Sequence, residues 1–186
     1  MKAEETKEKI IEKTIELIRE SNGLKENITI RKIAEKAKVG VGLINHHFGT
    51  KENLIEECVQ RIIGGVISAF RPILKEDEDH IGITKCVAKQ VMDFLMDNPE
   101  ISKISIIGDL KQPKERDNTM GTVRGFSSRL SGGNMQSFPS INSFMITAVM
   151  QVAFLRKDVL LQTLGVDFYD KVQRDAFIDD IIEKFR

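Results

Sequence analysis

The chain has 186 residues, 41% hydrophobic and 30% charged, so it can bury a sizeable core and has the composition of an ordinary globular protein. Its formal net charge is zero, which excludes a protein that is strongly basic throughout and binds nucleic acid by bulk charge alone. The two cysteines lie in apolar surroundings, the N-terminus is charged, and no apolar run approaches the ~20 residues that span a membrane. We therefore expect a cytoplasmic protein without metal, cofactor or membrane partner.

Residues 4–21 predict a first helix, because isoleucines recur on one face at positions 11, 15 and 18. The pair Asn22-Gly23 ends it. Thr29 is a candidate N-cap for a second helix, and a short break near residues 38–40 separates this from a very short third helix at about 41–47. Thr50 then caps a long helix that carries a dense apolar stripe to about residue 70.

The second half of the chain predicts helices over 81–96, 100–110, 141–156 and about 168–185. The segment 119–140 is rich in Gly, Ser and Thr, and we expect it to be loose, with Phe126 and Leu130 as helical anchors. No segment shows the alternation of a strand. The predicted fold class is all-α with about nine helices, divided into an N-terminal domain (1–50) and a C-terminal helical domain (51–186).

Charge and spacing single out residues 29–51, which hold five basic residues against one acidic residue. A local basic patch of this kind attracts phosphate even on a neutral chain. Three helices with short breaks, the second and third of them basic, describe a helix-turn-helix unit. The pattern is Thr29-Ile30-Arg31-Lys32-Ile33-Ala34, then Gly42-x-Ile44, then Phe48-x-x-Lys51-x-x-Leu54.

Over residues 8–60 this pattern resembles the N-terminal domain of TetR-family transcriptional regulators. Over 61–186 the resemblance consists only of length and helical character. The chain departs from the family in three places: Lys38 where Gly is frequent, Gly40 where Ser or Thr is frequent, and Asn45 where Tyr is frequent. The resemblance implies a recognition helix near residues 41–47 that lies in the major groove of DNA.

The candidate DNA contacts follow from that geometry. Gly42 would let the backbone approach DNA closely, Val41 and Leu43 could touch thymine methyl groups, and Asn45 could bind phosphate or adenine. The two histidines are placed either for phosphate contact or simply at the surface, while a phosphate at Lys51 would meet both the ammonium and a helix N-terminus. The full set is Thr29, Arg31, Val41, Gly42, Leu43, Asn45, His46, His47 and Lys51.

The resemblance further implies a homodimeric, ligand-responsive repressor of a palindromic operator in double-stranded DNA. We expect dimerisation through 141–155 and 177–185, and a small, largely apolar effector bound in the C-terminal domain. Its candidate lining is Met92, Met96, Phe126, Phe144, Met145 and Met150. No catalytic motif is present, so we do not expect an enzyme; the alternatives are an all-helical protein-interaction module or a small helical enzyme that does not bind DNA.

Overall fold

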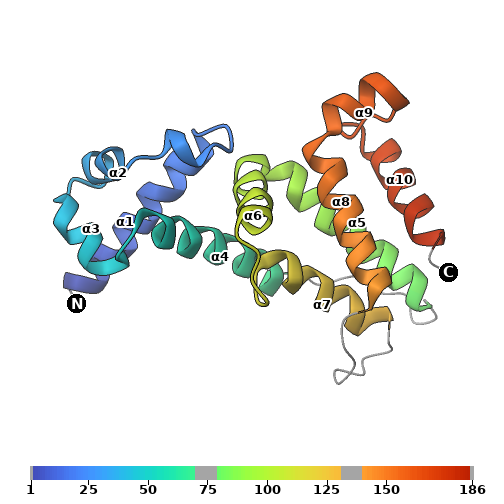
Figure 1. Ribbon diagram of the computed structural model, residues 1–186, viewed down its shortest axis with the longest axis horizontal. Helices are drawn as coiled ribbons and strands as arrows, with labels where there is room; N and C mark the ends of the chain where they lie inside the picture. Colours follow the sequence, from blue (N-terminus) through green and yellow to red (C-terminus); the bar gives the residue numbers. More distant parts are fainter. Residues whose placement is uncertain (1, 70–78, 131–139, 185–186) are drawn as a thin grey trace. The chain divides into compact units, whose positions relative to one another are not determined.

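The computed structural model describes residues 2–69, 79–130 and 140–184. Every regular element in these ranges is helical, with ten α-helices and one short 3-10 turn, which confirms the all-α prediction (Figure 1). The chain packs as two compact units, one formed by residues 1–70 with 99–108 and the other by 71–98 with 109–186. The division predicted at residue 50 follows the helix-turn-helix motif rather than this packing.

The first unit begins with helix α1 (Lys2–Arg19), which ends in a turn where Asn22 and Gly23 both have positive φ angles, 55° and 76°. The Asn-Gly pair therefore acts as the predicted stop, since both residues tolerate the left-handed region. A 3-10 turn, η1 (Lys25–Asn27), leads to α2 (Ile30–Ala37), α3 (Val41–Phe48) and the long helix α4 (Lys51–Ala69).

The core of the first unit is built from the inner faces of α1 to α4. Its fully buried members come from every helix of the unit, and they include Ile11, Ile18, Ile33, Ile44, Leu54 and Cys58. Ion pairs lie at the edge of the α1–α4 contact, where the Arg61 guanidinium binds both carboxylate oxygens of Glu8 and the Lys7 ammonium lies 2.8 Å from Glu57 Oε1. Packing thus fixes which faces of α2 and α3 remain outward.

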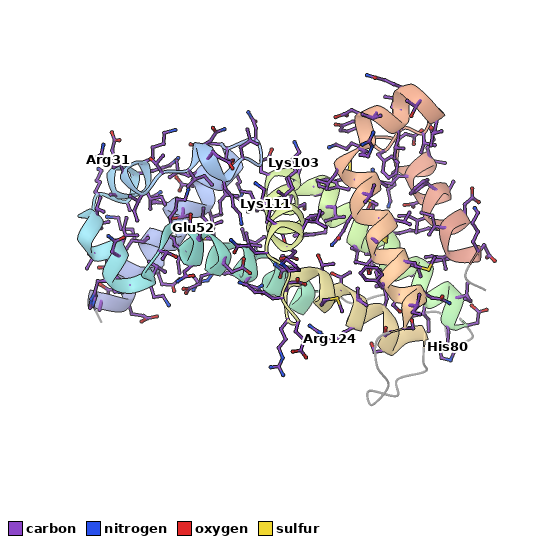
Figure 2. All side chains as sticks on the ribbon, in the orientation of Figure 1. Arg31, Glu52, His80, Lys103, Lys111 and Arg124 are labelled. Atoms are coloured by element: carbon purple, nitrogen blue, oxygen red, sulfur yellow. The ribbon has the colours of Figure 1, made fainter. Side chains whose placement is uncertain are left out.

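Helix α6 (Pro99–Lys111) contributes its first ten residues to this unit. Ile101 and Ile104 are buried in the core cluster of the first unit. The aliphatic part of Lys103, labelled in Figure 2, covers Gly23 so closely that a Cβ there would lie 2.6 Å from Lys103 Cδ. Gly23 is therefore required twice, by its φ angle and by this approach.

The second unit contains α5 (His80–Asp97), α7 (Asn118–Leu130), α8 (Ile141–Leu155), α9 (Lys157–Leu164) and α10 (Lys171–Glu183). Helix α5 packs against α7, α8 and α10, and α7 packs against α8. The Asp93 carboxylate on α5 accepts hydrogen bonds from Lys171 Nζ at 2.7 Å and Arg174 Nη2 at 2.6 Å on α10. Within the described residues, no helix is both long and apolar enough to cross a bilayer.

One expectation for the second unit was wrong, and one of its helices was missed. Residues 119–130 are not loose but form most of α7. Two carboxylates stabilise its start: Asp117 Oδ1 accepts a hydrogen bond from the Met120 amide, and Asp109 Oδ2 accepts one from the Thr119 amide. The rest of that segment, 131–139, lies outside the described residues. The helix missed is α9, and with it the described residues form ten α-helices. Arg156, with φ −111° and ψ 13°, both ends α8 and begins α9.

Candidate nucleic-acid interface

The turn between α2 and α3 sets the geometry of the candidate interface. The Thr29 hydroxyl caps α2 by accepting the Lys32 amide at 3.3 Å, as the sequence predicted. At the other end of α2, Lys38 adopts the left-handed conformation (φ 54°, ψ 48°), and its amide donates to the last carbonyls of the helix. The next helix, α3, begins three residues later at Val41.

Burial of one side of each helix determines what faces outward. Ile33 and Ala37 of α2 and Ile44 and Phe48 of α3 are buried in the core. On α3 this leaves a short run of exposed positions that includes two apolar side chains, Val41 at 36% and Leu43 at 39% exposure. Gly42, Asn45 and His46 are exposed beside them, and Thr29 and Arg31 are exposed on α2. The structure therefore brings most of the sequence-derived DNA candidates to the surface of one motif.

Neither glycine at the start of α3 is required by the fold. A Cβ added at Gly40 or at Gly42 would meet nothing within 4 Å. Gly40 has an ordinary φ of −72° and occupies the N-cap position without a side-chain cap. Alanine would make this helix more stable than glycine does, and the free protein has room for its methyl group at position 42. The reason for a glycine there must therefore lie outside the isolated domain, in something that α3 contacts.

The histidines of α3 differ in their surroundings. His46 is exposed and His47 half-buried, and their rings meet edge-on with centroids 5.5 Å apart. The His47 ring also lies 6.0 Å from that of Phe48, whose own ring packs under the Lys7 ammonium at 5.7 Å. His47 is thus partly engaged in packing, while His46 is free to reach a ligand in solvent.

Several basic side chains of residues 29–51 already have partners. The Lys36 ammonium lies 2.5 Å from Glu20 Oε1 and 3.5 Å from Glu16 Oε2, and the hydrogen bond to Glu20 raises the pKa of Lys36. Lys32 Nζ donates to the Asn27 carbonyl at 3.1 Å. Lys51, in the first turn of α4 as predicted, is half-buried, with its Nζ 3.4 Å from the Lys25 carbonyl oxygen.

Arg31 and Lys38 differ from these three. Both side chains are exposed, and among the described residues neither makes a hydrogen bond or ion pair through its cationic group. Figure 2 shows the labelled Arg31 side chain extending away from α2 into solvent. The sequence already marks Lys38 as a departure, because glycine is frequent at this position and the lysine adds a charge to the turn, but the set of candidate contacts includes only Arg31.

The candidate effector residues do not share one lining. Met92, Phe126 and Met150 are buried in the second unit and Met96 is half-buried, whereas Phe144 and Met145 are 51% and 43% exposed on the outer face of α8. On the same helix as Met92, the Gln90 side-chain oxygen is buried and has no hydrogen-bond partner among the described residues. Arg124 is exposed and donates to the Glu115 carbonyl at 3.0 Å (Figure 2).

Comparison with known families identifies the motif. Residues 10–58 match the family model described as bacterial regulatory proteins, tetR family. The match covers most of α1, all of α2 and α3, and the first two turns of α4. A search of curated proteins gave no match.

Proposed function

We propose, from the premise that residues 10–58 are the DNA-binding domain of a TetR-family regulator, that this protein is a homodimeric repressor that binds a palindromic operator and is released by a small effector. The observation that carries the proposal is the exposed start of α3, where Gly42 has open space and two apolar side chains face solvent. Such a surface is complementary to base edges and methyl groups rather than to water.

In this proposal α3 lies in the major groove with its N-terminal residues at the base edges. Val41 and Leu43 contact thymine methyl groups, and the Asn45 amide binds adenine N6 and N7 or a backbone phosphate. Gly42 allows the helix backbone to reach the DNA without an intervening side chain. Thr29, Arg31, His46, His47 and Lys51 surround this centre and contact phosphates, which fix register rather than sequence.

The outer face of α8 supports dimerisation. Its exposed apolar residues recur at helical spacing along the whole helix: Ile141, Phe144, Met145, Val149 and Val152. A contiguous apolar face of this kind marks an interaction site, and a second copy would place two recognition helices on two half-sites. On α10, Ile178 and Ile182 are buried within their own unit and Asp180 and Glu183 are exposed, so α8 supplies the apolar part of the proposed interface.

The effector is the finer part of the proposal. Met92, Phe126 and Met150 belong to the apolar interior of the second unit, and the buried Gln90 oxygen, which has no partner among the described residues, would accept one hydrogen bond from a bound molecule. These features favour a largely apolar, drug- or lipid-sized effector. A hundredfold loss of operator affinity requires the effector to prefer the released dimer by about 2.7 kcal/mol.

Sequence selection from a random duplex pool tests DNA binding. We expect recovered sites with two inverted half-sites about 10 base pairs apart, or a multiple of that spacing, and affinity that falls steeply with salt. Absence of salt-sensitive binding would contradict the proposal and favour an interaction module for an acidic protein.

Sedimentation of two variants tests dimerisation. Val149→Glu on α8 should yield a monomer, while Leu110→Glu, at a residue 67% exposed on α6, should leave the dimer intact.

A further inference from the structure

We propose that Lys38, in the turn between α2 and α3, is a phosphate anchor of the DNA interface and works together with Arg31 at the opposite end of α2. This inference rests on the proposed function, because it names residues of the same DNA surface. Three observations support it: the backbone conformation of Lys38, the charge partners of its neighbours, and its position on α2.

The backbone of Lys38 is the first observation. Among the described residues that are not glycine, only Asn22 and Lys38 have a positive φ. Asparagine adopts this region more readily than lysine does, and a glycine here would relieve the strain. Strain of this kind persists where function requires the side chain that causes it. The lysine therefore contributes something that the turn itself does not need.

The partners of the neighbouring cations are the second observation. Lys36 is held by two glutamates, Lys32 by a backbone carbonyl, and Lys51 is half-buried beside the Lys25 carbonyl. A cation that is already paired must give up its partner before it binds phosphate. Arg31 and Lys38 are exposed and make no such contact within the described part of the chain, so they can bind phosphate without first giving up a partner.

The position of the two residues is the third observation. Arg31 is the second residue of α2, and Lys38 follows its last residue, so their backbones lie about 10 Å apart along the helix axis. The first helix of a helix-turn-helix motif crosses the DNA backbone while the second enters the groove. Free cations at both ends of that first helix would bind two phosphates and set the entry angle of α3.

A simpler role for Lys38 is to interact with the negative end of the α2 dipole. Lys36 already lies in the last turn of α2, and a dipole role would be independent of DNA. The two roles predict different salt dependences, because only a phosphate contact releases a counterion when DNA binds. This difference decides between them.

The experiment measures binding of a fluorescent random-sequence duplex by the full chain between 50 and 200 mM salt. Lys38→Asn removes the positive charge and introduces a residue that tolerates the backbone conformation of the turn. Lys38→Arg keeps the positive charge. The control is Lys114→Asn, which removes an exposed lysine from the second unit. Loss of one phosphate contact lowers the slope of log K against log salt by about 0.9, so the advantage of the wild-type protein should shrink about 3.5-fold across this range.

We expect a reduced slope for Lys38→Asn, and the wild-type slope for Lys38→Arg and Lys114→Asn. Lys38→Gly should also raise the melting temperature by about 2–4 °C through relief of strain. A wild-type slope in Lys38→Asn, with DNA binding intact, would overturn this inference and leave the proposed function standing. If the wild-type protein showed no salt-dependent binding at all, both would fall together.

Discussion

Gly42→Ala should make the protein more stable and a weaker DNA binder. The added methyl group meets nothing within 4 Å in the free protein, so no clash offsets the gain in helix propensity. That gain reaches about 1 kcal/mol in a helix interior. Gly42 is the second residue of α3, where helical constraint is weaker, so we expect about 0.5 kcal/mol and a rise in melting temperature of about 1–2 °C.

In the proposed complex, the same methyl group would stand between the α3 backbone and the DNA. If the backbone of α3 moves about 1 Å away from the DNA, a van der Waals contact loses up to half of its attractive energy. A hydrogen bond of about 2.9 Å would lengthen beyond its normal range. We therefore expect operator affinity to fall between tenfold and a hundredfold, about 1.4–2.7 kcal/mol. The salt slope should not change, because no charge is removed.

Thermal denaturation and fluorescence anisotropy on a selected operator measure the two effects in the same sample. Gly121→Ala is the matched control, since Gly121 is also exposed near the start of a helix, α7, with nothing within 4 Å of an added Cβ. It should stabilise the protein without affecting DNA binding. Operator affinity at the wild-type level in Gly42→Ala would refute the close approach of the α3 backbone to DNA.

Three further predictions concern single side chains. Lys51→Ala should weaken binding about evenly across sequences and lower the salt slope by roughly one unit; an unchanged slope in anisotropy titrations would show that Lys51 does not bind phosphate. Burial raises the pKa of the Cys58 thiol to about 12, so mass spectrometry at pH 8 should find it alkylated only after unfolding. Burial raises the pKa of Asp93, but hydrogen bonds from Lys171 and Arg174 outweigh this and the net pKa is lowered. The stabilisation is then present above a pH of about 4 and lost as pH falls through the folded pKa, so the difference in melting temperature between wild type and Asp93→Asn should narrow towards pH 3.

The elements of the first unit could be predicted because their signals are local. The isoleucine spacing of α1, the Asn-Gly stop, and the caps at Thr29 and Thr50 are all readable within a few residues. The start of α7 has a local cap at Asp117, but it also depends on Asp109, which lies ten residues before the Thr119 amide that donates to it. Glycine and serine content hid that helix, and the burial of Val123 and Phe126 stabilises it.

The candidate site shows the same limit. Residue types and spacing predicted which faces of α2 and α3 are exposed, because their apolar positions determine the buried face. They could not predict which cations are free, since the partners of Lys36 and Lys51 lie 16 and 26 residues away in sequence. The candidate effector residues do not lie together in the structure. Phe144 and Met145 are on the outside of α8, and because this helix is apolar on most sides, its sequence did not show which side is buried.

Three of the five residues 38–42 are not the residues that would stabilise the isolated fold most. Lys38 is in a conformation that glycine would adopt without strain, Gly40 leaves α3 without a side-chain cap, and Gly42 reduces helix propensity in open space. Each could be replaced by a residue that suits the isolated fold better. A turn that only faces solvent does not require these three departures. A surface that binds a polyanion favours a charge in the turn and an unobstructed backbone after it. The proposed DNA interface accounts for the charge at Lys38 and the unobstructed backbone at Gly42 with one cause, so Lys38→Gly and Gly42→Ala should each reduce DNA binding.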